Sequence, residues 1–176
     1  FFQFIGAPIL GRLSDRVGRK KVLIISQLGT FIAWALFLLA FVLPSFNLWS
    51  QETSLTGKYV MTLPLITIFL ARILDGFTGG NISVANAYMS DVSTDKDRSK
   101  NFGKMGASTS LGFVLGPALA GVLAATALGT VLPLILAAII SLVAIFVIQF
   151  RLKETVPGIV DTGTFSKKSI RQFFQV

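Results

Sequence analysis

The chain carries the stretch Gly11-Arg12-Leu13-Ser14-Asp15-Arg16-Val17-Gly18-Arg19-Lys20-Lys21 between two strongly apolar segments. Five of these residues are cations, one is a carboxylate and two are glycines. So dense a cluster of charge cannot lie in hydrocarbon, and it would also interrupt a soluble core. We therefore expect a tight polar turn at a membrane surface, and the excess of Lys and Arg places that surface on the cytoplasmic side.

The composition of the chain also indicates a membrane protein. Of its 176 residues, 53% are hydrophobic and 14% are charged, and the mean hydropathy is +0.74, which exceeds the values of ordinary soluble domains. The net charge of +8 does not indicate nucleic-acid binding, because the cations flank apolar runs instead of forming one face. Cys and His are absent from the sequence, which removes disulfides and the usual zinc-binding patterns, and we expect no metal site and no cofactor.

Four apolar segments are long enough to span a bilayer, since a spanning helix needs about 20 mostly apolar residues. They are 22–43, 63–90, 102–127 and 131–150. A further segment, 1–10, would reach only about 15 Å as a helix, and we interpret it as the cut end of a longer one. The expected fold class is therefore all-α: a polytopic membrane helix bundle over residues 1–155, in a chain that is a fragment.

The connections between these segments are alternately rich and poor in cations. The connection 91–101 contains three, whereas 44–62 contains only Lys58 and 128–130 contains none. This alternation follows the positive-inside rule and places the cation-rich connections in the cytoplasm. Residues 156–176 are expected to form a cytoplasmic segment toward the rest of the polypeptide, either a helix on the inner membrane face or an unstructured linker.

The segment 63–90 carries charged residues at membrane depth. Arg72 lies about 13 Å along the expected helix and Asp75 one turn further. A charge near the bilayer centre costs about 2.5 to 3.5 kcal/mol, so both are expected to face a bundle interior or a wet cavity, on one face with Ser83 and Asn86. Two interpretations stay open: a self-neutralising pair that fastens helices together, or a cavity that handles substrate or protons with Asp75 as the proton carrier.

The segment 102–127 is rich in small residues. Gly112 and Gly116 are four residues apart and Gly121 follows, a pattern that lets two helices touch backbone to backbone. Pro117 removes a helix hydrogen bond and favours a kink, which a membrane bundle tolerates. The spacing does not decide between static packing and a helix that bends or seals during a conformational cycle.

These motifs resemble the signatures of the major facilitator superfamily of secondary transporters. The stretch 11–21 is similar to the Gly-x-Leu-x-Asp-Arg-x-Gly-Arg-Lys signature between its helices two and three, and matches at every specified position. Arg72 with Gly76 resembles the arginine-bearing signature of helix four. The run 112–121 resembles the Gly-x-x-x-Gly-Pro-x-x-x-Gly signature of helix five, which is associated with antiporters.

Two further runs, 75–81 and 87–91, are most similar to the tetracycline-efflux-like branch of drug:proton antiporters. The resemblance implies helices two to six of a twelve- or fourteen-helix protein, with helix one and the second half outside this sequence. It implies a secondary active transporter, not an enzyme, that exports drugs or small organic molecules in exchange for protons by alternating access. The implied location is the plasma membrane (a bacterial inner membrane or its equivalent), and the implied partners are the lipid bilayer, a small-molecule substrate, protons and the remainder of the same polypeptide.

The resemblance also assigns roles to individual residues. Asp15, Arg19 and Asp91 would form a cytoplasmic charge cluster that latches the two halves of the transporter in the outward-facing state. The same signature contains Gly11, Arg16 and Gly18. Arg72 would serve proton coupling or substrate binding, and the helix that contains the Gly116-Pro117 pair would limit proton leak.

Two alternatives to an exporter remain open. One is a proton-coupled symporter that imports a sugar or metabolite, against which the Gly-Pro signature argues. The other is a non-transporting membrane protein that keeps the same fold, such as a receptor or an assembly partner. The Arg72–Asp75 pair disfavours that second alternative, because buried charges are costly to retain without use.

Overall fold

The computed structural model describes residues 1–53 and 57–156, and for residues 51–53 and 57–59 it describes the backbone alone. The predicted cytoplasmic segment 156–176 therefore lies outside the described residues, except for Val156. The elements in chain order are α1 (Phe2–Val17), α2 (Arg19–Val42), β1 (Asn47–Thr53), β2 (Gly57–Thr62), α3 (Leu63–Thr78), the 3₁₀ turn η1 (Gly79–Asn81), α4 (Ile82–Val92), α5 (Arg98–Ala124) and α6 (Val131–Arg151).

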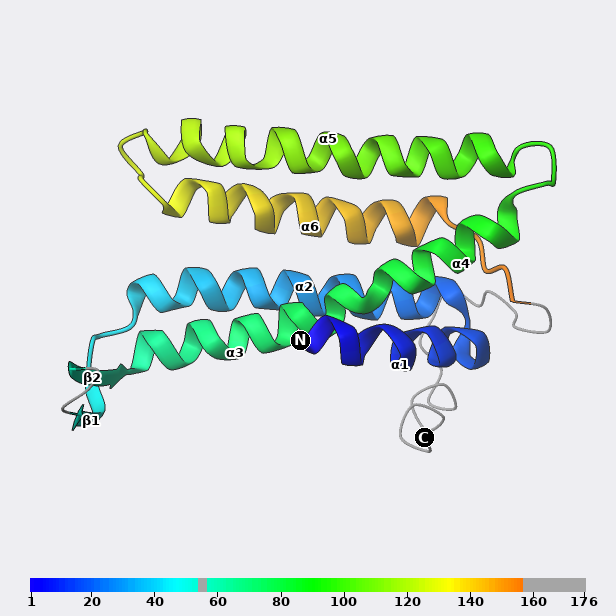
Figure 1. Cartoon of the computed structure of the whole chain (residues 1–176). Coiled ribbons are helices and arrows are strands. Elements are labelled where there is room, and N and C mark those ends of the chain that lie inside the picture. The colour runs from blue at the N-terminus through cyan, green and yellow to red at the C-terminus, as the bar shows by residue number, and fades with distance from the viewer. Residues whose placement is uncertain (54–56, 157–176) are drawn as a thin grey trace.

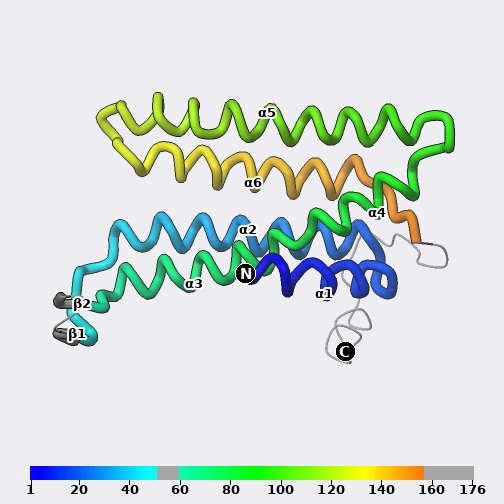
Figure 2. The backbone as a smooth tube through the Cα atoms, viewed as in Figure 1, coloured from blue at the N-terminus to red at the C-terminus, as the bar shows by residue number. Residues whose placement is uncertain are grey.

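The described residues form a bundle of long antiparallel helices (Figure 1). Four helical stretches in this part of the chain are long and apolar enough to cross a membrane: Arg19–Val42, Leu63–Val92, Arg98–Ala124 and Val131–Arg151. The second of these joins α3, η1 and α4 into one bent rod. The backbone trace shows α6 lying between α5 and α2, with α1 beside the rod (Figure 2). The predicted all-α membrane bundle and its four spans are confirmed.

The connection 44–62 contains a small β-hairpin that the sequence does not predict. Strands β1 and β2 pair antiparallel, with Ser50 opposite Val60 and Glu52 opposite Lys58. Outside the apolar part of a spanning helix, the backbone can form its hydrogen bonds in a pair of strands as well as in a helix. The hairpin lies at one end of the bundle and the α1–α2 turn at the other (Figure 1), so Lys58 and Lys20 lie at opposite ends, as the alternation of cations predicts.

The cation-rich stretch 11–21 consists mostly of helix ends. Helix α1 continues to Val17 and α2 begins at Arg19, so a single residue, Gly18, makes the turn with φ 113 and ψ 141. Side chains with a Cβ rarely adopt that conformation. A Cβ at Gly18 would also overlap the carboxylate of Glu154. The tight polar turn is thus where we predicted it, but it is one residue long, and its charged side chains project from helices.

Close backbone packing occurs between α1 and η1. A Cβ added to Gly80 would stand 2.5 Å from the amide nitrogen of Ala7 and 2.6 Å from the carbonyl carbon of Gly6, and a Cβ on Gly6 would overlap the carbonyl oxygen of Phe77. Small residues at this crossing therefore allow the two helices to touch backbone to backbone. This contact brings the entry of α4 against α1.

Helix α5 makes no comparable contact with the described residues. A Cβ at Gly112, Gly116 or Gly121 would meet nothing within 4 Å there, and no residue of α5 is buried. The helix continues through Pro117 without a break. The close helix packing that we predicted for 102–127 is therefore absent from the described part of the bundle, where α5 packs along α6 and leaves its glycine face uncovered.

The Gly80 contact yields a stability prediction. We expect Gly80→Ala to lower the melting temperature of the full-length protein, because the added methyl meets backbone atoms that cannot rotate away, and overpacking of this kind costs about 1–3 kcal/mol. Gly79→Ala is the matched control, since a Cβ there would meet only the Gln3 Cδ at 4.0 Å. Thermal unfolding in detergent compares the two variants, and equal melting temperatures would contradict the backbone contact.

Candidate functional site

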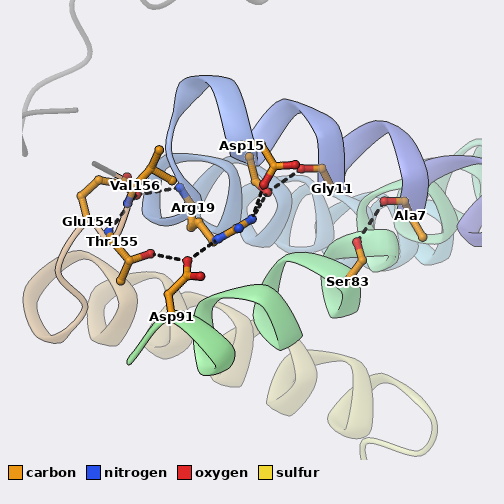
Figure 3. A network of polar contacts seen from close by, with 10 residues as sticks. Ala7, Gly11, Asp15, Arg19, Ser83, Asp91, Glu154, Thr155 and Val156 are labelled. Atoms are coloured by element: carbon orange, nitrogen blue, oxygen red, sulfur yellow. Dashed lines mark hydrogen bonds and ion pairs between the residues drawn. The ribbon is translucent and has the colours of Figure 1, made fainter. Parts of the chain in front are cut away.

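The first candidate site is a charge cluster around Arg19, the first residue of α2. The Nε of Arg19 lies 2.6 Å from an oxygen of Asp91, and its Nη1 lies 2.8 Å from an oxygen of Asp15 (Figure 3). Nη1 also donates to the hydroxyl of Ser14 at 3.0 Å. The Arg19 side chain is 14% exposed, whereas the side chains of Asp15 and Asp91 are 60% and 31% exposed, so the cation is better shielded from water than its two partners. The structure thus brings together the three residues that the superfamily resemblance groups, from α1, α2 and the end of α4.

Two further members of the cluster come from the chain that follows α6. The backbone N–H of Arg19 donates to Oε1 of Glu154 at 2.8 Å, and the N–H groups of Thr155 and Val156 donate to the same oxygen at 3.0 and 3.3 Å. The hydroxyl of Thr155 donates to Asp91 at 2.9 Å. Glu154 therefore accepts a free N–H at the start of α2, where the helix dipole also favours a negative charge.

Sequence reasoning missed Glu154 and Thr155. The available signal was weak: a single carboxylate directly after Arg151 and Lys153, at the end of the last apolar segment. Nothing in the spacing links that position to Gly18, which lies more than 130 residues earlier in the chain. Only the fold brings the exit of α6 beneath the α1–α2 turn, where the second oxygen of Glu154 is buried without a hydrogen-bond partner in the described residues.

Other residues of the 11–21 signature have different surroundings. Gly11 accepts a hydrogen bond at its carbonyl from the hydroxyl of Ser14, 2.7 Å away. Arg16 is exposed on α1 and, within the described residues, takes part in none of the hydrogen bonds and ion pairs that surround Arg19. Within the signature, the cluster therefore depends on Asp15, Gly18 and Arg19, with Ser14 as a supporting hydroxyl.

The second candidate site is the pair Arg72 and Asp75 on α3. An Nη1 of Arg72 and an oxygen of Asp75 are 4.0 Å apart, and the guanidinium carbon of Arg72 lies 4.8 Å from the centre of the Phe37 ring on α2, within cation–π range. The Arg72 side chain is 65% exposed in the described chain and that of Asp75 is 26% exposed. Because both charges are on one helix and loosely paired, the ion pair itself does not fasten two helices together.

Ser83 and Asn86 lie on α4, beyond the 3₁₀ turn from that pair. The Ser83 hydroxyl stands 2.9 Å from the carbonyl oxygens of both Ala7 and Gly80, so it serves the α1–α4 contact (Figure 3). Asn86 is exposed. The polar face expected along 63–90 is therefore divided by η1, and a place for these two side chains in a transport cavity stays a prediction.

The bend at η1 is itself held by polar side chains. Ser26 of α2 donates to the carbonyl of Thr78 at 2.5 Å, and Gln3 of α1 donates to the carbonyl of Gly79 at 3.1 Å. A 3₁₀ turn inside a helix leaves carbonyls without their usual partners, and in a membrane these must be satisfied by neighbouring side chains. The bend thus forms a defined joint between α3, which carries Arg72 and Asp75, and α4, which carries Asp91.

The helix-five signature residues are spread along an uncovered side of α5. Gly112, Gly116, Pro117 and Gly121 are all exposed in the described chain. None of them contacts the charge cluster or the Arg72–Asp75 pair in any interaction that the structure shows. Their predicted part in limiting proton leak therefore depends on what covers this face in the full protein, and it remains a prediction.

The chain has several apolar spans, with cations and a charge cluster at one end and a charged pair at membrane depth. These features define a multi-pass membrane protein of the transporter type. The chain belongs to the major facilitator superfamily, whose family model matches residues 1–175. Members of this family are transporters and, in general, not enzymes. The predicted superfamily is therefore confirmed.

The relatives in this superfamily include tetracycline resistance proteins. The class C protein of Escherichia coli is 37% identical over 122 residues, which are 69% of this chain and 25% of that protein. The class B protein of the same organism is 34% identical over 162 residues, 92% of this chain and 34% of that protein. The similarity to tetracycline-efflux-like proteins is thus confirmed, and the chain spans a quarter to a third of the length of these relatives.

The fold is also that of a solved transporter structure. The crystal structure of the human organic anion transporter MFSD10 superposes with a TM-score of 0.70 at 22% identity, covering 95% of this chain and 33% of that one. At this identity the likeness concerns the fold alone. It agrees with the helical bundle described above.

Proposed function

We propose that the full protein is a secondary active transporter in the plasma membrane that exports a drug or small organic molecule in exchange for protons. The observation that carries the proposal is the Arg19 cluster, which ties four separate parts of the chain together at one end of the bundle. Alternating access requires contacts that close one end of a transporter and can be broken. The tetracycline resistance relatives support the choice of drug efflux over import.

The cluster is suited to a reversible latch because two carboxylates from different helices bind one guanidinium. Asp15 and Asp91 bind the guanidinium of Arg19, and Glu154 accepts the backbone N–H of the same residue. The carboxylates repel one another, so the assembly depends on Arg19, and a few kcal/mol of differential stability is enough to shift a two-state population. In the proposed cycle the latch holds the cytoplasmic end closed in the outward-facing state and opens when the bundle rearranges.

Proton coupling would take place at the Arg72–Asp75 pair. Asp75 is the carboxylate that lies well inside the described spans, since Asp91 is near the end of its span. A proton on Asp75 removes its attraction for Arg72 and frees the guanidinium to bind substrate or to move. Deprotonation of Asp75 restores the ion pair. Proton binding and substrate binding are therefore coupled through the Arg72 guanidinium.

The latch proposal predicts the outcome of an accessibility experiment. We expect Asp91→Asn in the full-length protein to raise the rate at which a cysteine introduced at Asn86 is labelled from the cytoplasmic side. Loss of the carboxylate charge weakens the bond to Arg19, and about 1 kcal/mol shifts the two-state ratio about fivefold. Labelling by an impermeant maleimide measures the rate.

The matched control for this experiment is Asp95→Asn. Asp95 is an exposed carboxylate four residues further along the same connection, and it takes no part in the Arg19 cluster. Its replacement should leave the labelling rate unchanged. If Asp91→Asn also labelled at the parental rate, the cluster would not act as a latch.

A further inference from the structure

The bend at η1 lies between the proposed proton carrier and the proposed latch, on one continuous rod. The carbonyl of Asp75 accepts the N–H of Gly79 at the start of the bend, and Asp91 lies near the end of α4. From Thr78 to Asp91 the rod is about 20 Å long. A change of about 10° in the bend would therefore move Asp91 by about 3 Å, which is enough to break a hydrogen bond.

The backbone of the bend is close to that of a continuous helix. Gly79 and Asn81 have φ of −61° and −62°, and both have ψ of −12°, whereas residues of an α-helix have ψ of about −42°. Both residues lie in the right-handed helical region, so the rod can straighten through a small change in ψ without a steric barrier. Contacts with other helices must therefore keep the rod bent.

Two successive carbonyls of the bend accept hydrogen bonds from side chains of other helices. The hydroxyl of Ser26 on α2 donates to the Thr78 carbonyl. The amide of Gln3 on α1 donates to the Gly79 carbonyl. In a straight α-helix these carbonyls would accept the N–H groups four residues further on. A side chain that enters this ladder of backbone bonds is a recognised cause of a helix bend.

The contact between Ser26 and Thr78 is complete within the described residues. Ser26 is 1% exposed and Thr78 is 7% exposed. A Cβ at Gly29 would overlap the Thr78 side chain, and the hydroxyls of Thr30 and Thr78 are 3.2 Å apart. All four residues belong to α2 and α3. This contact therefore does not depend on what covers the outer surface of the bundle.

We propose that Ser26 is a positioning residue that holds the α3–α4 rod in its bent form and thereby keeps Asp91 within reach of Arg19. Loss of the Ser26 bond lets the rod straighten, and α4 then withdraws Asp91 from the cytoplasmic cluster. The inference rests on the proposed latch and deepens it. It names the contact inside the membrane that sets the position of one latch carboxylate.

The first test is a double-mutant comparison in the full-length protein. We expect Ser26→Ala to raise the cytoplasmic labelling rate of a cysteine at Asn86 about fivefold, since one lost hydrogen bond shifts a two-state ratio by about that factor. In S26A/D91N the rate should equal that of Asp91→Asn alone, because the contact that Ser26 maintains is already lost.

The second test measures the bend separately from the latch. Spin labels replace Val92, the last residue of α4, and Phe150 near the end of α6, both of which are exposed in the described chain. Pulsed electron paramagnetic resonance then gives the distance between the labels. Ser26→Ala should shift that distance by about 3 Å. Gln3→Ala removes the second donor to the bend and should shift the distance in the same direction.

Ser141→Ala is the matched control. Ser141 on α6 is 3% exposed and accepts a hydrogen bond from Gln27 on α2 at 2.9 Å. This variant therefore also removes a buried hydroxyl that bonds α2 to a neighbouring helix, but away from the bend. Both variants should lower the melting temperature in detergent, whereas only Ser26→Ala should change the labelling rate and the distance.

Three results would overturn the proposal. An unchanged distance in Ser26→Ala would show that Ser26 does not hold the bend. Equal changes in Ser26→Ala and Ser141→Ala would assign the effect to the general packing of α2. Additive labelling rates in S26A/D91N would separate Ser26 from Asp91. A shifted distance in Ser26→Ala, with an unchanged labelling rate in Asp91→Asn, would refute the latch and still support Ser26 as the residue that holds the bend.

Discussion

Replacing Arg72 with alanine in the full-length protein is expected to abolish pH-gradient-driven efflux while leaving the protein in the membrane. The guanidinium lies over Phe37 of α2 and opposite Asp75, so its removal takes away the cation that links a titratable carboxylate to the neighbouring helix. It also leaves Asp75 uncompensated at a depth where a charge costs about 2.5 to 3.5 kcal/mol. Efflux from inverted vesicles, driven by an imposed pH gradient, measures the effect.

Two companion variants distinguish coupling from folding. R72A/D75N removes both charges and should leave efflux abolished, because the uncompensated carboxylate is gone while the coupling pair is still missing. Arg72→Lys keeps the charge but not the planar group that stacks on Phe37, and should leave a reduced rate. Unchanged efflux in Arg72→Ala would remove the pair from the transport mechanism.

Gly18→Ala is expected to disrupt the cytoplasmic charge cluster. The residue has a φ of 113, a conformation that costs about 1–3 kcal/mol for a residue with a side chain. The added methyl would also displace the Glu154 carboxylate, which accepts the first N–H of α2. We expect a lower melting temperature of the full-length protein, and faster cytoplasmic labelling of the cysteine at Asn86.

The two causes of this effect can be separated. In G18A/E154A the overlap is absent but the backbone strain remains, so part of the lost stability should return. Gly103→Ala is the matched control, because a Cβ there meets nothing within 4 Å in the described residues and lies inside α5, where Ala is the better helix former. A melting temperature of Gly18→Ala equal to that of Gly103→Ala would show that neither the turn nor Glu154 constrains this position.

Much of the architecture could be predicted because a bilayer imposes simple rules on a sequence. An apolar core of fixed thickness requires apolar runs of about 20 residues, and the four runs became helices. The cost of charge in hydrocarbon singled out Arg72 and Asp75. The signature 11–21 and the position of Asp91 led, through the superfamily resemblance, to the three side chains that meet at Arg19.

Other parts of the site depend on contacts between distant segments. Glu154 and Thr155 carry no local pattern that points to Arg19, since helix lengths and packing decide where α6 ends relative to the α1–α2 turn. The pair Gly79-Gly80 is visible in the sequence, but the bend at η1 is held by Gln3 and Ser26 from other helices. The glycines of α5 show the converse: a pattern of close packing for which the described chain holds no partner.

The sequence by itself determined that this chain spans a membrane, how many described helices do so, which end of the bundle carries the positive charge, and which superfamily it belongs to. The first three properties follow from composition and length along the chain, because each segment partitions between water and hydrocarbon according to its own residues. The superfamily follows from the resemblance of the signature residues. The tertiary structure alone decided that one glycine makes the α1–α2 turn and that Glu154 closes the Arg19 cluster. Those features arise where separate helices meet, and no local sequence pattern shows which residues of distant segments will come into contact.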